Sequence, residues 1–393
     1  MRFFALAAAF AVLPLVAARQ EPEISSGFDH FYNLEYDQAL ADFHQEIANQ
    51  PNDPDGYNHV AQSILYRGMF RSGALESELV GGTNSFLRRP KVTIPANDEA
   101  EFFHSIDRAV QLSQALIQKN PNDKKALYAL GVAYGLRANY NFLVRKAWRD
   151  SLRDASLARE THAKLTAIDP SFVDARLTQG LDDYVVGSLP WAVRMLGFLA
   201  GIRGDREDGI RELELVAMEG DHNKINAQIL LAVIYRREKH SAAAIPLLEN
   251  LARRFPRNPL YLFEIADMYS DIGDKQNALK ALVRIQDLKN AGAPGFKDWP
   301  EQKIRYARGN LLFRYNDLDP ALADMKQVTQ NARDLDLNAG GTAWMRMGQI
   351  YDLKGNRPEA VAAYKQAIAF APESAAARES NGYLSSPYRR GAG

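Results

Sequence analysis

The chain has 393 residues, of which 46% are hydrophobic and 24% are charged, a balance typical of a folded globular protein. Lysine plus arginine and aspartate plus glutamate number 48 each, so no overall field favours nucleic acid or an anionic membrane surface as a partner. The sequence contains no cysteine, which excludes disulfides, thiolate metal sites and a cysteine nucleophile. We therefore expect packing to provide the stability, and any recognition by charge to be local.

Residues 1–18 have the three parts of a secretion signal. Arg2 supplies a positive charge, an uncharged run of sixteen residues follows, and residues 16–18 provide a small-residue cleavage site. The run is interrupted by Pro14 and is shorter than the roughly 20 residues that a membrane-spanning helix needs. We predict that 1–18 is a cleaved signal peptide and that 19–27 is a disordered lead. The mature protein is then exported, to a periplasm or the cell exterior, without a transmembrane segment.

Several residue types recur at one spacing further along the chain. Tyr235 and Tyr269, Leu231 and Ile265, and Ala244 and Ala278 are each 34 residues apart. The clearest single copy of the pattern consists of Trp344, Met347, Gly348, Tyr351, Ala360, Tyr364, Ala367 and Pro372. This copy resembles the tetratricopeptide repeat, whose pattern over about 34 residues places these residue types at these spacings.

The resemblance implies an all-α fold, a right-handed α-solenoid of about seven to eight helix pairs with two insertions inside repeats. Each pair is too small to bury a face alone, so small residues let its two helices approach and tyrosines fill the space between neighbours. The small residues are Gly131, Ala232, Ala266 and Gly348, and the tyrosines are Tyr134, Tyr235, Tyr269 and Tyr351. Proline is expected to end second helices at Pro51, Pro121, Pro170, Pro256 and Pro372.

The copies differ in regularity along the chain. We predict an irregular half over 28–222 with insertions at 72–98 and 187–205, a regular repeat array over 223–372, and a cap with a tail over 373–393. Both insertions fall at the turn inside a repeat, and in solenoids such insertions gather on one face.

The second insertion contains an apolar stretch from Trp191 to Ile202. Twelve helical residues extend about 18 Å, which is too short to cross a bilayer. The stretch is apolar on all sides, and such a helix is typically buried. We expect it to pack inside the curve of the solenoid. The alternative is an exposed patch through which Trp191 and Phe198 contact a partner or a membrane interface.

The sequence around this stretch has a narrower resemblance. A leucine-proline pair at 189–190, an apolar helix and a Gly204-Asp205 turn are similar to a segment of the tetratricopeptide family that contains the yeast mitochondrial inclusion-clearance protein. The secretion signal departs from what that intracellular family implies. The resemblance implies a repeat scaffold with an internal apolar helix, and it transfers no activity.

The sequence shows no catalytic or metal-binding motif. It lacks a phosphate loop, a His-Glu-x-x-His helix, a Gly-x-Ser-x-Gly elbow and a calcium loop, and its seven histidines include no pair at helical spacing. We therefore expect no metal, no cofactor and no enzymatic activity. The alternative is an enzyme whose pocket contains Asp182, Asp183 and Arg145. Adjacent carboxylates on a helix do not face each other, however, and a solvated helix end is the expected place for both.

Arg145, Arg149 and Arg153 recur every four residues and predict a basic stripe on one helix. Arginines at that spacing repel one another unless an anionic group faces them. Neighbouring acids such as Asp150 and Asp154 are one source of that group, and a carboxylate-bearing or phosphate-bearing ligand is the other.

These observations predict an exported, non-enzymatic scaffold that binds a protein or peptide in its concave groove. Recognition by stacked helix pairs uses side chains on the first helix of each repeat. The inward positions there are assigned to Asn58, Gln62, Tyr128, Tyr306, Asn310, Met345 and Gln349. Nucleic acid is not an expected partner, peripheral membrane contact through 191–202 is the alternative, and self-association is left open.

Overall fold

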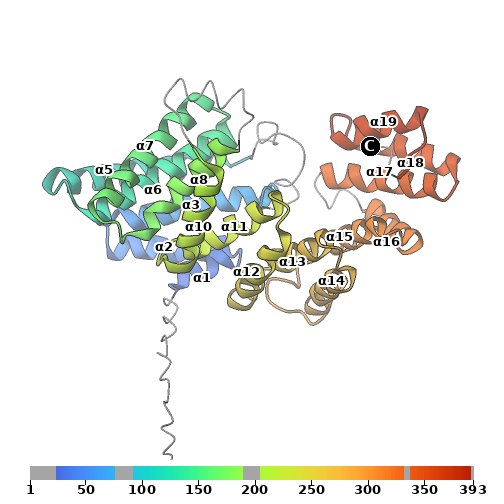
Figure 1. Ribbon diagram of the computed structural model, residues 1–393, viewed down its shortest axis with the longest axis horizontal. Coiled ribbons are helices and arrows are strands. Elements are labelled where there is room, and N and C mark those ends of the chain that lie inside the picture. The colour runs from blue at the N-terminus through green and yellow to red at the C-terminus, as the bar shows by residue number, and fades with distance from the viewer. Residues whose placement is uncertain (1–23, 76–91, 189–203, 332–336, 391–393) are drawn as a thin grey trace, which may run out of the picture.

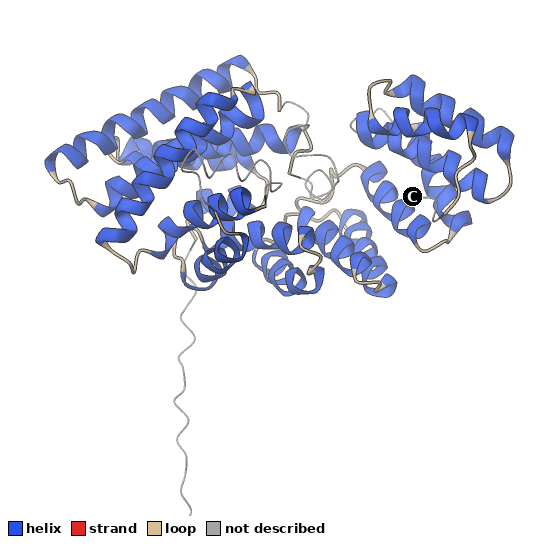
Figure 2. Ribbon diagram, turned by 45° about the horizontal axis from the view of Figure 1, so that its top comes forward, coloured by secondary structure: helices blue, strands red, loops and turns tan. Residues whose placement is uncertain are grey.

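A computed structural model of the chain describes residues 24–75, 92–188, 204–331 and 337–390. In these ranges every regular element is helical and no strand occurs (Figure 2). The expected all-α fold is therefore confirmed. The predicted signal peptide lies outside the described residues, so its cleavage stays a prediction.

Most of the described helices form eight consecutive pairs of helices that pack against each other. The first four pairs are α1 (Ser26–Tyr32) with α2 (Tyr36–Asn49), α3 (Pro54–Arg71) with α5 (Ala96–Lys119), α6 (Lys124–Tyr140) with α7 (Trp148–Ile168), and α8 (Arg176–Gly187) with α10 (Arg206–Glu219). The next four are α11 (Lys224–Arg237) with α12 (Ser241–Arg254), α13 (Leu260–Asp271) with α14 (Lys275–Asn290), α15 (Glu301–Arg314) with α16 (Leu318–Gln330), and α17 (Leu337–Leu353) with α18 (Arg357–Phe370). Helix α19 (Ala375–Ser385) packs on the last pair, and two short elements, η2 (Asn141–Arg145) and η3 (Val173–Ala175), complete the set. The predicted solenoid of helix pairs is confirmed.

Proline sets the end of five second helices, as the sequence predicts. Helices α2, α5, α7, α12 and α18 each end two residues before one of the prolines Pro51, Pro121, Pro170, Pro256 and Pro372. The residue before a proline is disfavoured in the helical region of backbone space, so the helix stops there.

The repeated tyrosines connect each first helix to the second helix of the preceding pair. The hydroxyl of Tyr235 donates to Oε1 of Glu214 at 2.7 Å, and that of Tyr269 donates to Oε1 of Glu249 at 3.2 Å. The repeated small residues act within a pair. A Cβ atom on Gly348 would lie 2.4 Å from the ring of Tyr364, so only glycine allows α17 and α18 to approach this closely.

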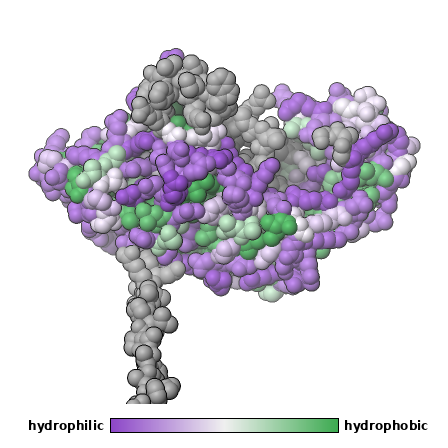
Figure 3. Space-filling view, viewed as in Figure 1, coloured by the Kyte–Doolittle hydropathy of each residue, from purple (hydrophilic) through white to green (hydrophobic). Residues whose placement is uncertain are grey.

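The helix pairs follow one another along an elongated molecule. Figure 1 shows α1 to α8 gathered at one end, α17 to α19 at the other, and α12 to α16 between them. On the face shown in Figure 3 hydrophilic side chains predominate, and hydrophobic ones lie in separate patches. Among the residues that the structure describes, no helix is both long and apolar enough to cross a membrane.

The first pair also packs against the turn between the fifth and sixth pairs. The ring of Tyr32 lies 4.9 Å from that of Phe255. In a separate contact, the ring of Phe70 in α3 of the second pair lies 6.1 Å from that of Trp299, which precedes α15. These residues belong to one apolar core that runs from α1 through α3, α11 and α13 to α15. The first two pairs are thus packed against residues from the middle of the chain.

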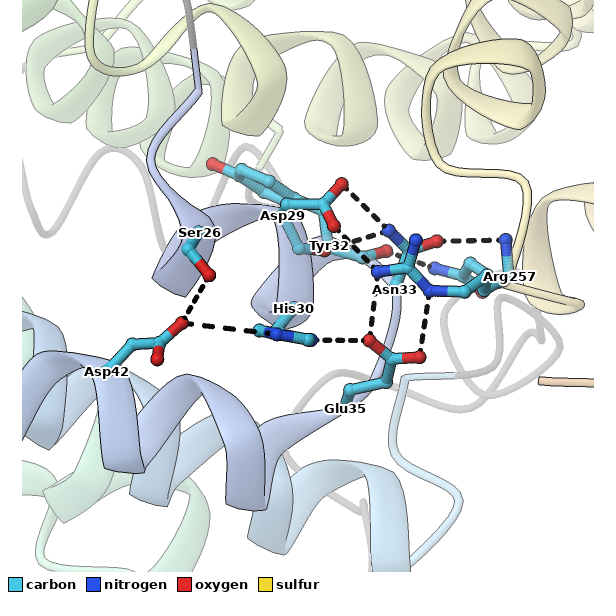
Figure 4. A network of polar contacts seen from close by, with 9 residues as sticks. Ser26, Asp29, His30, Tyr32, Asn33, Glu35, Asp42 and Arg257 are labelled. Atoms are coloured by element: carbon cyan, nitrogen blue, oxygen red, sulfur yellow. Dashed lines mark hydrogen bonds and ion pairs between the residues drawn. The ribbon is translucent and has the colours of Figure 1, made fainter. Parts of the chain in front are cut away.

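A polar network closes the same contact (Figure 4). The guanidinium of Arg257 donates to both carboxylate oxygens of Glu35 at 2.8 and 2.9 Å and to Oδ2 of Asp29 at 2.6 Å. The backbone N–H of Arg257 donates to Oδ1 of Asn33 at 2.9 Å, and Nδ2 of Asn258 donates to the carbonyl of Tyr32 at 2.8 Å. We call this set of contacts the Arg257 network. It joins residues that are more than 220 positions apart in the sequence.

Two local boundaries differ from the sequence predictions. Helix α1 begins at Ser26, inside the segment 19–27 that we predicted to be disordered, because Gly27 is buried against the ring of Phe43. Helix α5 begins at Ala96, inside the predicted insertion 72–98. The remaining domain boundaries stay predictions, since 76–91 and 189–203 lie outside the described residues.

Candidate functional site

A pocket of about 410 Å³ lies between the first helices of three successive pairs, α13, α15 and α17. Its polar lining consists of Asp267, Ser270, Tyr306, Asn310, Arg314, Arg346 and Arg390. Its apolar lining includes Leu282 and Phe313. We call this site the α15 pocket.

The walls of the α15 pocket are held by arginines that reach from one first helix to the next. Nε of Arg346 donates to Oδ1 of Asn310 at 3.0 Å and so joins α17 to α15. Nη1 of Arg314 donates to Oγ of Ser270 at 2.8 Å and to Oδ1 of Asp271 at 2.9 Å, which joins α15 to α13. Because each bond crosses between neighbouring pairs, the pocket exists only in the assembled solenoid.

The α15 pocket is more positive than negative. Three guanidinium groups line it, those of Arg314, Arg346 and Arg390, together with one carboxylate, that of Asp267. Burial raises the pKa of Asp267, and the guanidinium of Arg236 at 2.9 Å opposes that rise. A partner that presents hydrogen-bond acceptors, such as the carbonyls of an extended backbone, complements this lining.

Two of the predicted groove residues line the α15 pocket, and two others from α17 have different roles. Tyr306 and Asn310 line the pocket. Gln349 is buried and accepts a hydrogen bond from Nη1 of Arg346 at 2.7 Å. Met345 packs with Ala360, Tyr364, Ala367 and Ala376. The inward assignment of Met345 is wrong, because this side chain faces α18 and α19 rather than the pocket.

The predicted groove residues of the first half take part in internal packing. The amide of Asn58 is buried, and its Nδ2 donates to the carbonyl of Ala129 at 2.9 Å. The hydroxyl of Tyr128 accepts from Nδ2 of Asn223 at 2.8 Å, its ring stacks on His162 at 5.5 Å, and burial raises its pKa well above the usual value. Gln62 is half-buried on α3. Asn58 and Tyr128 therefore hold the chain together and do not line an open groove.

The predicted basic stripe does not lie on one helix. Arg145 ends the π-helix η2, Lys146 then has a φ of 56°, and α7 begins at Trp148. Arg145 donates to Oε1 of Glu99 at 2.8 and 2.9 Å, and it lies 3.9 Å from the ring centre of Phe103. The prediction fails because the left-handed residue rotates η2 away from the register of α7.

The two other arginines of the predicted stripe lie on α7, where one of them is paired. Arg153 lies 3.3 Å from Asp150 and 3.6 Å from Asp154, and Arg149 is exposed. The negative charge that faces Arg153 therefore comes from neighbouring acids, one of the two sources considered from the sequence.

Asp182 and Asp183 both contact Arg159 of α7, and Oδ1 of Asp183 lies 3.0 Å from its Nη2. The prediction that both carboxylates lie at a solvated helix end is wrong. The two side chains are adjacent in the sequence, but the guanidinium of Arg159 contacts both of them. Burial raises the pKa of Asp183, and Arg159 opposes the rise. Trp191 and Phe198 lie outside the described residues, so the alternatives for 191–202 are untested.

The sequence analysis missed the arginines of the α15 pocket. Arg314 follows the predicted groove residue Asn310 by four residues, so the repeat register alone could have placed it beside the groove. Arg390 lies beyond the last repeat, where no periodic signal exists.

Comparison with known protein families agrees with this arrangement. Models described as tetratricopeptide repeat match residues 229–293 and 341–374. The chain therefore contains tetratricopeptide repeats in these two regions. The matched regions contain α13 and α17, which supply two walls of the α15 pocket. These comparisons do not bear on the narrower resemblance around 189–205, which stays a prediction.

Individual relatives are distant. Over 159 residues the chain is 25% identical to a protein of Drosophila melanogaster named BBSome complex member BBS4 homolog, a match that covers 40% of this chain and 30% of that protein. The chain thus spans under a third of the length of that relative.

Two solved structures of similar shape also match. The APC/C hetero-tetramer Cut9–Hcn1 has a TM-score of 0.48 at 14% identity, covering 90% of this chain and 53% of that one. Yeast Tom70 has a TM-score of 0.40 at 13% identity, covering 91% and 86%. With TM-scores below 0.5, neither match supports a conclusion about function.

Proposed function

We propose that this tetratricopeptide-repeat protein is an exported, non-enzymatic scaffold that binds an extended segment of a partner protein in the α15 pocket. The observation that carries the proposal is the pocket itself, which three successive first helices build from side chains that can donate hydrogen bonds. A segment crossing it contacts several repeats at once, and this is how stacked helix pairs gain affinity for an extended ligand.

Other features support a scaffold rather than an enzyme. Tetratricopeptide repeats suggest an interaction scaffold, and the Drosophila relative is named as a member of a protein complex. The carboxylates considered for catalysis, Asp182 and Asp183, are both engaged by Arg159.

Peptide selection tests the binding proposal. Random peptides displayed on phage are selected on the folded protein, and their affinities are then measured by titration calorimetry. We expect Arg346→Ala, in the α15 pocket, to weaken the selected peptides at least tenfold. Arg284→Ala, exposed on the second helix α14, should leave them unchanged. Selected peptides that bind both variants equally well would contradict the proposal.

Export is tested separately by expression in a bacterium with a periplasm. We expect the protein in the periplasmic or culture fraction to begin at Arg19, as determined by mass spectrometry of its N-terminal peptide. Protein that keeps residues 1–18 and stays in the cytoplasm would contradict this part of the proposal.

A further inference from the structure

The segment that follows α19, residues 386–390, packs back against α15 and α17. The backbone N–H of Tyr388 donates to Oδ2 of Asp352 at 2.8 Å. The ring of Tyr388 lies 6.1 Å from that of Phe313 in α15 and 5.4 Å from that of Tyr383. The segment is therefore held by α15 and α17, the helices that form the α15 pocket.

Arg390 reaches further along the same surface. Its guanidinium donates to the carbonyl of Phe313 and, at 3.2 Å, to the carbonyl of Arg314. Both carbonyls belong to the last turn of α15, where backbone acceptors lack partners within the helix and the helix dipole favours a cation.

Phe313 is the meeting point of these contacts. The guanidinium carbons of Arg390 and Arg346 lie 4.8 and 4.3 Å from the centre of its ring. A cation at such a distance is attracted by the ring quadrupole. Pro387, Arg389 and Arg390 are all exposed, and of the two arginines it is Arg390 that makes the contacts with Phe313. The segment thus binds through two side chains, one aromatic and one cationic, with a single residue between them.

Asp352 makes the site specific for an extended backbone. Its carboxylate is buried and accepts hydrogen bonds from Nη1 of Arg357 at 2.9 and 3.0 Å and from the hydroxyl of Tyr364 at 2.9 Å. These bonds fix the position of Oδ2, which accepts the backbone N–H of Tyr388. Three groups of the protein therefore await a peptide: the carboxylate of Asp352 accepts a backbone N–H, the ring of Phe313 packs against an aromatic ring, and the carbonyls at the end of α15 accept from a guanidinium.

We infer that this surface is a binding site for an extended peptide with an aromatic residue followed two positions later by an arginine, and that 386–390 is its intramolecular ligand. The inference deepens the proposed function, on which it rests. Arg390 lines the α15 pocket, so a partner segment of the same chemistry displaces 386–390 when it binds.

The probe is a labelled synthetic peptide of residues 385–390 with both ends blocked, and binding is measured by fluorescence anisotropy. A tethered ligand has an effective concentration on the order of 1 mM, so the full chain should bind the peptide poorly. A variant that ends at Ser385 should bind it at least tenfold more tightly. The full-length double variant Tyr388→Ala/Arg390→Ala should do the same, and it keeps the backbone that follows α19 if the shortened chain folds poorly.

Changes in the peptide test which side chains matter. Tyr388→Ala or Arg390→Ala in the peptide should abolish binding to the variant that ends at Ser385. The matched change Arg389→Ala should preserve binding, because it is Arg390 that reaches the carbonyls at the end of α15 and the ring of Phe313. Equal loss with Arg389→Ala and Arg390→Ala, together with no loss for Tyr388→Ala, would mean attraction by charge alone and would overturn the inference.

The inference and the proposed function fail in different ways. If the opened variants melt as the full chain does and still bind the peptide no better than it does, the inference is wrong. Phage-selected peptides that depend on Arg346 would then still support the function. If neither kind of peptide depends on this surface, both are wrong.

Discussion

Three buried aspartates hold helices together within their pairs. Arg137 of α6 donates two hydrogen bonds of 2.9 Å to Asp154 of α7, and Arg308 of α15 donates two to Asp324 of α16, at 2.7 and 2.6 Å. Asp352 of α17 receives Arg357 of α18 in the same way. Paired bonds between arginine and a carboxylate fix geometry as well as charge, so these acids set how the helices of a pair lie against each other.

Asp154→Ala tests this role in α7. The carboxylate of Asp154 is fully buried, and removing one partner of a buried ion pair leaves the other charge poorly solvated. We expect a loss of about 3 kcal/mol in the free energy of unfolding, measured by urea denaturation. Asp150→Ala is the control, since Asp150 also contacts Arg153 but is 52% exposed, and it should cost less than about 0.5 kcal/mol.

His162 makes stability depend on pH. Its Nε2 faces the carbonyl of Tyr128 at 3.1 Å and must donate, so Nδ1 accepts from the hydroxyl of Thr178 at 2.9 Å and the ring is neutral. Burial lowers its pKa from 6.5 to about 4. Between these values the unfolded chain binds a proton that the native chain does not, so stability falls as the pH is lowered from 6.5 towards 4.

We expect this histidine to remove about 2 kcal/mol of stability between pH 7 and pH 5. The measurement is urea denaturation at both pH values, and the wild type should lose that much more stability than His162→Gln does. His104→Gln, at an exposed position, serves as the control and should lose as much as the wild type. Identical pH dependence of the wild type and His162→Gln would refute the assignment.

At the scale of the helical element, two glycines of α6 differ in what surrounds them. A Cβ atom on Gly131 would lie 2.2 Å from the ring of His162, whereas one on Gly135 would meet no atom within 4 Å. We expect Gly131→Ala to destabilise the protein by about 1 to 3 kcal/mol through overpacking. Gly135→Ala should stabilise it by up to about 1 kcal/mol, because alanine is the better helix former. Thermal melts followed by circular dichroism give both values, and the expectation fails if the two melts shift in the same direction.

The elements were predictable because each repeat reproduces the same local contacts. Gly348 packs against the ring of Tyr364, and α18 ends two residues before Pro372. Residue types at a fixed spacing therefore predict where these helices pack and where they end. The break between η2 and α7 was not predictable, since it depends on the backbone of Lys146, a residue type that does not indicate a positive φ.

The candidate site was predictable only in part. Tyr306 and Asn310 follow from the repeat register, because the inward positions of a first helix recur. Met345 shows the limit of that reasoning, since α19 covers the last repeat and turns this position into core. The position of Arg390 follows from no pattern, because the segment after α19 belongs to no repeat.

At the scale of the whole molecule, the Arg257 network connects helix pairs that are not consecutive in the array. A solenoid usually unfolds piece by piece because each repeat contacts only the next one. Here the first pair is also held by the turn between α12 and α13. We therefore expect α1 to unfold together with the fifth and sixth pairs.

Arg257→Ala tests this coupling by hydrogen exchange. The substitution removes the bonds to Glu35 and Asp29 and keeps the backbone bond to Asn33. We expect faster amide exchange in α1, corresponding to a loss of about 1 to 3 kcal/mol there, and unchanged exchange in α18. Arg253→Ala, exposed on α12, should change neither helix. Unchanged exchange of α1 in Arg257→Ala would show that the apolar contacts alone hold the first pair.

The Arg257 network also determines when α1 can complete its contacts during synthesis of the chain. Asp29 of helix α1 finds its partner Arg257 only when the ribosome has added 228 residues beyond it. At roughly 5 to 20 residues per second this takes on the order of 10 to 45 s, during which Tyr32 lacks the ring of Phe255 that later packs on it. Helix α1 is therefore made early but completes its native contacts late, and the nascent chain must be kept from aggregating through that interval.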